Sequence, residues 1–223
     1  MNEKDGMGKR EQYRTVRREA SVELVIRRSR FIGHVAPVET EEEAQAFVER
    51  VRKNHSMATH NCYAYRVGDR DQWQKSSDDG EPAGTAGKPI LEVIAHRGLS
   101  NVAIVVTRYF GGVLLGAGGL IRAYTDAAAE AVKAGQPALM SLHQAVWADI
   151  DYTWYGKLEN ELRTAGVLVG ETRFTDRVSI ECLFPFGETE ARKNWLIDLT
   201  QGQAVLTSGE ARYIALPLPE EAG

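Results

Sequence analysis

A cluster of glycines is the first feature of the chain that could do chemistry: Gly111, Gly112, Gly116, Gly118 and Gly119. Glycine lets backbone amides approach a ligand closely, and the free amides at the start of a helix favour an anion. Arg108 precedes the cluster and Arg122 follows it, and a guanidinium group can bind phosphate through two hydrogen bonds. The cluster therefore predicts a phosphate-binding site, although a tightly packed turn would need the same glycines.

The known phosphate-binding motifs do not account for this segment. No Gly-Lys-Ser/Thr follows, as a P-loop requires, and the third glycine of a dinucleotide-binding fingerprint is missing. The chain also lacks a Gly-x-Ser-x-Gly elbow, a His-Glu-x-x-His helix and a Cys-x-x-Cys pair. We therefore expect no catalytic residue of these classes, no resident metal and no cofactor.

A second segment, residues 76–82 (SSDDGEP), carries three carboxylates: Asp78, Asp79 and Glu81. Together they could bind a divalent cation through oxygen ligands, or one of them could act as a base. The alternative is an Asx turn that leads into a helix, with Thr85 as the N-cap. His60 and these carboxylates form an accessory candidate site, if the fold brings them to the glycine cluster.

His60 and Cys62 could form a catalytic pair only if they were apposed in space. Cys62 alternates with other residues of a strand-like stretch, which favours a buried structural thiol. Aromatic side chains surround these motifs, at Tyr63, Tyr65, Tyr109, Phe110 and Tyr124. They could stack nucleic-acid bases, although alternating aromatics in strands are more often part of a core.

The charge of the chain limits its partners. It has 223 residues with 27 basic and 31 acidic side chains, a formal net charge of −4, so binding to nucleic acid must come from a local patch. Residues 1–30 hold nine basic and five acidic side chains, whereas residues 136–223 hold 7 and 13. Arg27, Arg28 and Arg30 form a short basic turn that we expect to face phosphate. The acidic C-terminal half would face solvent or a protein partner.

Cysteine content and hydropathy indicate a cytoplasmic protein. Cys62 and Cys182 form neither a disulfide framework nor a metal-ligand spacing, which fits a reducing compartment. Residues 1–20 show no signal-peptide core. The longest weakly interrupted apolar stretch, residues 111–121, is far shorter than the ~18 residues of a membrane span.

The elements that position the candidate residues follow from periodicity. Thr40 and Glu43 form a capping box, and apolar residues at helical spacing predict a helix over 41–54. Strands are expected within 14–26 and over 30–38, 61–67, 72–76 and 101–110. Helices are expected over 85–97 and from the end of the glycine cluster to Gly135. These elements form a predicted domain over residues 14–135.

The pattern restarts after the Gly-Gln-Pro stretch at 135–137, which indicates a second domain over residues 141–212. A strand over 143–152, a helix over 154–165, a hairpin of 167–174 and 177–184, a helix over 188–200 and a strand over 203–207 are expected. This β-α-β-β-α-β order is that of ferredoxin-like domains. Residues 1–13 and 213–223 are expected to be tails.

Four motifs resemble the IMPACT/YigZ family: residues 29–32 (SRFI), 59–65 (THNCYAY), 77–87 (SDDGEPAGTAG) and 107–124 (TRYFGGVLLGAGGLIRAY). The resemblance covers roughly residues 20–135, and residues 143–210 match the bacterial C-terminal domain by layout. It implies an α+β chain whose N-terminal domain is like the second domain of ribosomal protein S-five. It also implies a ferredoxin-like C-terminal domain similar to the last domain of elongation factor G. Family members are linked to translational regulation, and nucleic-acid or ribosome binding has been proposed for bacterial ones.

We therefore expect a non-enzymatic, translation-associated factor that binds RNA or the ribosome through the glycine cluster and the flanking arginines. One alternative is a nucleotide-dependent enzyme, in which the glycines hold phosphates and the carboxylates of residues 78–81 hold Mg²⁺. Another is a protein-interaction adaptor that binds its partner through the acidic C-terminal domain. The competition mechanism of eukaryotic members uses an additional N-terminal domain that this chain lacks, so it does not carry over.

Overall fold

The computed structural model describes residues 10–218. Contacts within the chain divide it into two compact units, one of residues 13–139 and one built mainly of residues 140–214. Most of the two expected tails, residues 1–9 and 219–223, lies outside the described residues. The inner ends of those segments are strand, because β1 starts at Gln12 and β10 ends at Leu216.

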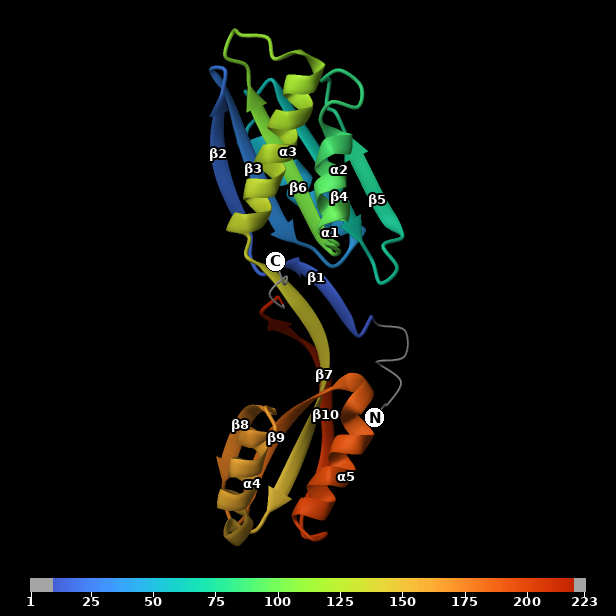
Figure 1. Ribbon diagram of the computed structural model, residues 1–223, viewed down its shortest axis with the longest axis vertical. Helices are drawn as coiled ribbons and strands as arrows, with labels where there is room; N and C mark the ends of the chain where they lie inside the picture. Colours follow the sequence, from blue (N-terminus) through green and yellow to red (C-terminus); the bar gives the residue numbers. More distant parts are fainter. Residues whose placement is uncertain (1–9, 219–223) are drawn as a thin grey trace. The chain divides into compact units, whose positions relative to one another are not determined.

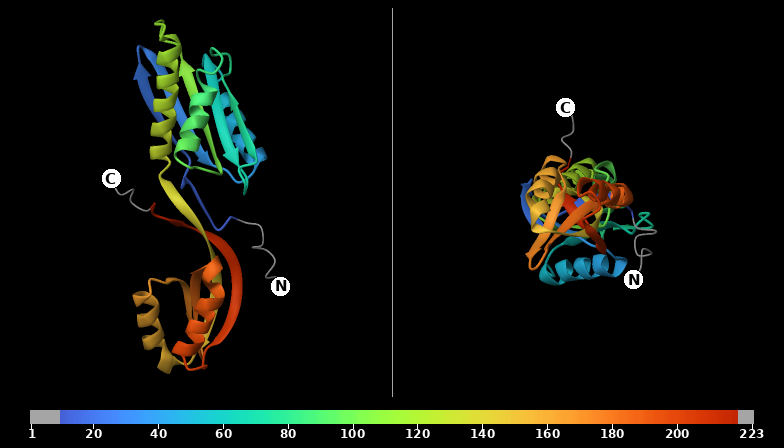
Figure 2. Two further views of the ribbon diagram at one scale, coloured as in Figure 1. Left: turned by 45° about the vertical axis from the view of Figure 1, so that its right-hand side comes forward. Right: turned by 90° about the horizontal axis from the view of Figure 1, so that it is seen from below.

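The first unit is a five-stranded antiparallel sheet with helices on both faces (Figure 1). Its strands in sheet order are β2 (Ala20–Ile26), β3 (Ser29–Pro37), β6 (Val102–Tyr109), β4 (His60–Val67) and β5 (Trp73–Ser77). One face is covered by α1 (Glu41–Asn54), and the other by α2 (Gly87–His96) and α3 (Gly116–Ala134). Figure 2 shows α1 on the opposite side of the sheet from α2 and α3.

The central strand β6 is apolar because both of its faces are buried. Ile104 and Val106 pack in the core under α2 and α3, while Ala103 and Val105 pack in the core under α1. Successive side chains of a strand point to opposite faces, so alternate residues serve the two cores. The buried strand expected over residues 101–110 is therefore at the centre of the sheet.

The helix starts follow local chemistry. Thr40 accepts a hydrogen bond from the Glu43 amide and α1 spans Glu41–Asn54, as the capping box predicted. The Glu43 carboxylate accepts from the Glu39 amide, one residue before the cap. By contrast, α3 begins at Gly116 rather than after Gly119, so three glycines expected in a loop lie in its first turn. The apolar residues from Leu120 onward pack this helix against the sheet, and this tertiary packing stabilises the helix despite the glycines in its first turn.

The second unit has the expected ferredoxin-like order. Its elements are β7 (Pro137–Ile150), α4 (Tyr152–Thr164), β8 (Leu168–Phe174), β9 (Val178–Pro185), a 3-10 turn (Phe186–Glu188), α5 (Thr189–Leu199) and β10 (Val205–Leu216). The sheet has the order β1-β7-β9-β8, with β1 at Gln12–Val16, and β10 also pairs with β7. Ile150, Leu158 and Cys182 are among the buried residues of its core. The last strand is longer than the stretch 203–207 that its sequence predicted.

These elements include no membrane span: none of the helices within residues 10–218 combines the length and the apolar character that crossing a bilayer requires.

Candidate nucleic-acid interface

The glycine cluster begins against the turn between β2 and β3. The Gly111 amide donates a hydrogen bond to the Ser29 hydroxyl oxygen, 3.1 Å away. A Cβ atom on Gly111 would collide with the backbone carbonyl of Arg28. Gly111 is therefore required for close packing, and this packing puts the backbone of Arg28 beside the start of the glycine cluster. Figure 1 shows the β2–β3 turn and the loop before α3 at the same end of the sheet.

The β2–β3 turn itself has an unusual backbone. Its two central residues, Arg27 and Arg28, have φ values of 45° and 68°. A two-residue hairpin with positive φ at both positions is a type I′ turn, for which Asn-Gly is strongly preferred. Both arginines are exposed, and the described residues provide no ion pair for either. The turn thus holds two solvated guanidinium groups at positions where arginine is disfavoured.

The first turn of α3 is open to solvent and has no competing acid. Its N-cap residue, Leu115, offers no side-chain hydrogen bond, and the first turn contains no Asp or Glu. The ideal Cβ positions of Gly112, Gly116 and Gly118 meet nothing within 4 Å. The free amides of this helix start, together with the positive end of its dipole, suit an anion. Arg122 is exposed one turn further along.

Two of the candidate arginines are already paired. Arg30 is exposed but donates to both carboxylate oxygens of Glu23, at 3.0 and 2.8 Å. Arg108 does not reach the surface on which we expected it, because β6 turns its side chain into the core. There its Nη1 donates to Glu81 Oε1 at 2.7 Å. Arg27, Arg28 and Arg122 are therefore the candidate arginines that are exposed and outside these ion pairs.

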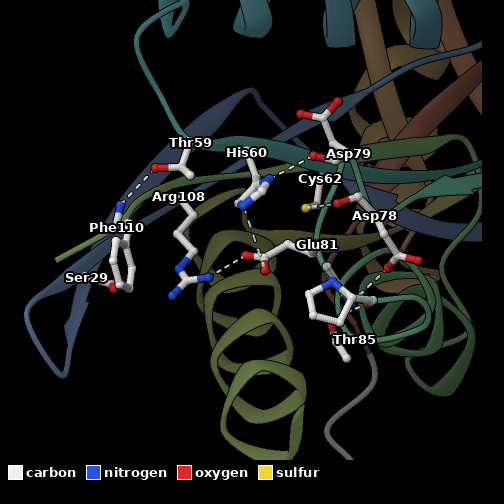
Figure 3. A network of polar contacts seen from close by, with 12 residues as sticks. Ser29, Thr59, His60, Cys62, Asp78, Asp79, Glu81, Thr85, Arg108 and Phe110 are labelled. Carbon is white, nitrogen blue, oxygen red and sulfur yellow. Dashed lines mark hydrogen bonds and ion pairs between the residues drawn. The ribbon is translucent and has the colours of Figure 1, made fainter. Parts of the chain in front are cut away.

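Glu81 is the centre of a buried polar cluster (Figure 3). Its Oε1 accepts hydrogen bonds from Arg108 and from the Tyr124 hydroxyl, both at 2.7 Å. His60 Nε2 lies 3.9 Å from Glu81 Oε2, and His60 Nδ1 lies 2.8 Å from the Asp79 carbonyl oxygen. A carbonyl only accepts, so Nδ1 is the protonated nitrogen and Nε2 faces Glu81. The cluster joins β4, β6, α3 and the loop before α2.

The chemistry of this cluster is structural. Burial raises the pKa of the Tyr124 hydroxyl far above its ordinary value, so that Tyr124 remains a hydrogen-bond donor. Burial also raises the pKa of the Cys62 thiol to about 12, and the thiol donates to the Asp78 carbonyl oxygen. A thiol that remains protonated is a poor nucleophile. Cys62 is therefore a core residue, and it does not form a catalytic pair with His60.

The two aspartates hold the loop in place. The Asp78 carboxylate accepts from the amides of Gly84, Ala86 and Gly87, and so caps α2 from eight residues before the helix N-cap. Burial raises the pKa of Asp78, but these three donors outweigh it and the net shift is downward. The Thr85 hydroxyl donates to the Pro82 carbonyl oxygen, so Thr85 is not the cap that we expected.

Asp79 is used in the same way. Its Oδ2 accepts from the Asn61 amide at 2.7 Å, and its Oδ1 pairs with Arg52 at 3.0 Å. Asp78, Asp79 and Glu81 thus point to different partners. Within residues 10–218 there is no group of three His, Cys, Asp or Glu side chains arranged to hold a metal ion.

The structure therefore separates the candidate residues into two sets. His60, Glu81 and Arg108 come together inside the unit, while Arg27, Arg28, Gly111 and Gly112 come together on its surface. Two residues have roles that sequence analysis did not assign: Ser29 binds the Gly111 amide, and Thr59 Oγ1 accepts from the Phe110 amide at 3.0 Å. Both residues begin motifs that the sequence analysis identified, but their roles depend on which segments pair in space, which the motifs alone do not show.

Comparison with known proteins covers both units. Residues 27–132 match the Impact N-terminal domain, and residues 149–203 match a domain of unknown function, DUF1949. "IMPACT family member YvyE" of Bacillus subtilis (strain 168) is 45% identical over 202 residues, or 91% of this chain and 93% of that protein. "Protein IMPACT" of Oryctolagus cuniculus is 41% identical over 100 residues, or 43% of this chain and 31% of that protein. A crystal structure described as that of a hypothetical protein covers 95% of this chain and 99% of its own, with 31% identity and a TM-score of 0.58.

Proposed function

The chain belongs to the IMPACT family, and from that premise we propose that it is a translation-associated factor that binds RNA, free or in the ribosome. Membership of this family supports a translation-related regulatory role in general. The binding surface of the proposal, here termed the phosphate surface, consists of Arg27, Arg28, Gly111, Gly112, the first turn of α3 and Arg122. Such a protein would act in the cytoplasm, and by binding rather than by catalysis.

The observation that carries the proposal is the backbone of the β2–β3 turn. A non-glycine residue in a left-handed conformation costs about 1–3 kcal/mol, and such residues concentrate at functional sites. Asn-Gly would make this turn without strain, yet the chain has two consecutive arginines there. A ligand that needs two positive charges at this position accounts for the choice, and phosphate is an anion that arginine binds through two parallel hydrogen bonds.

The neighbouring features favour the same ligand. The open start of α3 offers backbone amides to a second phosphate, and Arg122 adds a cation within two turns. Contacts of this kind provide affinity and register but little sequence specificity. With a net charge of −4, the whole molecule would repel RNA, so a local surface has to supply the attraction.

The test is to replace the turn by its preferred sequence. The double variant Arg27→Asn/Arg28→Gly should lower affinity for a labelled RNA at least tenfold and reduce the slope of log affinity against log salt by about 1–2. Its free energy of unfolding should rise by about 1 kcal/mol, because the relief of backbone strain exceeds the conformational entropy that glycine adds to the unfolded chain. A variant that removes equal charge elsewhere, Arg70→Gln/Lys75→Gln, is the matched control and should bind like wild type.

A second pair of variants tests the helix start. Gly118 has open space at its Cβ position, so Gly118→Glu and Gly118→Gln should both fold. The glutamate stabilises the helix dipole but repels phosphate, so only Gly118→Glu should lose RNA binding. Equal binding by all these variants, or no binding by wild type at low salt, would exclude the phosphate surface.

The nucleotide-enzyme alternative has less support, because Asp78 and Asp79 are occupied by backbone amides and by Arg52. Binding heat in a calorimetric titration with millimolar Mg-ATP would support this alternative. A protein partner for the acidic residues 141–212 is a separate proposal. Crosslinks from the intact chain that map to these residues would support it.

A further inference from the structure

We infer that the RNA bound at the phosphate surface is single-stranded there, with one base stacked on the ring of Phe110. This inference rests on the proposed function and goes beyond it by naming the form of the nucleic acid. It starts from the aromatic side chains near the glycine cluster, which differ sharply in exposure.

Phe110 is the aromatic residue of this group that faces solvent. Tyr65 and Tyr124 are buried in the two cores, and Tyr63 and Tyr109 are partly covered. The Phe110 side chain is 47% exposed and directly precedes Gly111. A base that stacks on it would therefore have its sugar and phosphate next to the phosphate surface.

The ring of Phe110 is held in place from behind. The Arg108 guanidinium carbon lies 5.4 Å from the centre of the Phe110 ring and 5.4 Å from that of Phe31. Arg108 is itself fixed by Glu81, and the Phe110 amide is fixed by Thr59. A cation at the ring face is a favourable contact, so the ring is a prepared platform rather than a mobile side chain.

Further exposed apolar groups follow Phe110 in the chain and favour unpaired bases over a duplex. Leu114 and Ile121 are also exposed, and both belong to the segment from the glycine cluster into α3. An RNA duplex presents phosphates, 2′-hydroxyls and base edges but keeps its base faces stacked inside, so it offers an aromatic side chain nothing to stack on. A single strand exposes base faces, which stack on aromatic rings and cover apolar groups while the phosphates meet the cations. The juxtaposition of Phe110 with Arg27 and Arg28 matches that second ligand.

The experiment compares two RNA probes by fluorescence anisotropy at low salt: a labelled 12-nucleotide oligouridylate and a 12-base-pair RNA duplex. Wild type should bind the single strand at least tenfold more tightly. Phe110→Leu, which keeps the apolar volume but removes the aromatic face, should weaken single-strand binding about five- to thirtyfold and leave duplex binding unchanged. Phe110→Tyr should retain binding.

The matched control is Phe174→Leu, because Phe174 is 55% exposed in the other unit and should not affect RNA. A 2-aminopurine base in the single strand should be quenched by wild type and not by Phe110→Leu, a readout that a merely structural role would leave unchanged. Equal affinity for the two probes, or unaltered single-strand binding by Phe110→Leu, would overturn the inference while the proposed function stands.

Two other outcomes would also overturn it. If neither probe binds wild type, the proposed function fails and the inference fails with it. If Phe110 instead contacts a second copy of the chain, wild type would sediment as a dimer and Phe110→Leu as a monomer, with RNA binding the same in both.

Discussion

Each compact unit holds a Glu–Arg ion pair against its sheet, and the two pairs differ in how far the arginine is exposed to solvent. In the unit of residues 13–139, the side chains of Arg108 and Glu81 are 6% and 3% exposed, and one hydrogen bond of 2.7 Å joins them. In the other unit, Arg212 and Glu181 are 45% and 10% exposed, and two hydrogen bonds of 2.8 and 2.9 Å join them. The pair with more hydrogen bonds is therefore the one whose arginine is half exposed.

This difference shows that the hydrogen-bond geometry of an ion pair does not predict how much stability is lost when one partner is removed. In the second pair Glu181 is buried but Arg212 is half exposed, so water still screens the pair and it contributes less. The buried pair gains from Tyr124 and His60, but its charges have left water, so the loss of one partner leaves the other uncompensated. Arg108 of the buried pair also contacts the ring of Phe110. A substitution in this pair should therefore also disturb the exposed Phe110 side chain.

The largest expected effect is that of Glu81→Gln. Glutamine keeps the shape of the side chain and can accept from Tyr124, but it leaves the Arg108 cation buried without a counter-charge. We expect the free energy of unfolding of this unit to fall by about 3–5 kcal/mol. Hydrogen exchange measures the amides of β4 and β6 separately from those of β7 and β9, and only the first pair should lose protection.

Glu181→Gln is the matched variant in the other unit and should cost less, about 1–2 kcal/mol, because Arg212 is half exposed and water can solvate its charge. Replacing the whole buried pair by apolar residues, as in Glu81→Leu/Arg108→Met, should restore part of the stability that Glu81→Gln loses. Equal losses in Glu81→Gln and Glu181→Gln would contradict the comparison.

A smaller effect is expected from adding a methyl group to one closely packed glycine in each unit. Gly111→Ala would push a Cβ into the Arg28 backbone carbonyl, which cannot move without shifting β3, and should cost about 2–3 kcal/mol. Gly170→Ala would meet the Glu181 carboxylate, the far end of a flexible side chain, and should cost well below that. Hydrogen exchange measured against denaturant concentration gives the stability of each unit separately. A larger loss in Gly170→Ala than in Gly111→Ala would refute this account.

The smallest expected effect is a difference between the two units in how their stability depends on pH. Burial and the neighbouring His55 lower the pKa of His34 from 6.5 to about 4. Between these values the unfolded chain binds the extra proton, so this unit should lose about 1–2 kcal/mol of stability as the pH falls from 6.5 to 4. His34→Gln should abolish that loss.

In the other unit, the hydrogen bonds from Arg212 hold the pKa of Glu181 below its ordinary 4.5. Its contribution is present above pH 4.5 and is lost only as the pH falls further. Protection in the two units, followed against pH, should therefore decline in two successive ranges. A simultaneous decline, or the same decline in His34→Gln, would count against the assignment.

Local rules predicted the elements well and the site only in part. Thr40 and the helical spacing after it were sufficient for α1, and the order of elements was sufficient for the ferredoxin-like unit. The pairing of Glu81 with Arg108 was not predictable, because 27 residues separate them and Glu81 lies in the loop after β5, whose course depends on the hydrogen bonds of Asp78. The start of α3 was misjudged because tertiary packing overrides the low helix propensity of glycine.

The two cysteines make the opening of each unit observable in the natural chain. Cys62 lies in the first unit and Cys182 in the second, both are fully buried, and burial raises the pKa of each thiol to about 12. A folded unit therefore hides its thiol from an alkylating reagent, and an unfolded one exposes it at ordinary reactivity. The rate at which each thiol is alkylated therefore reports how often its own unit opens, and the measurement needs neither a tag nor a substitution.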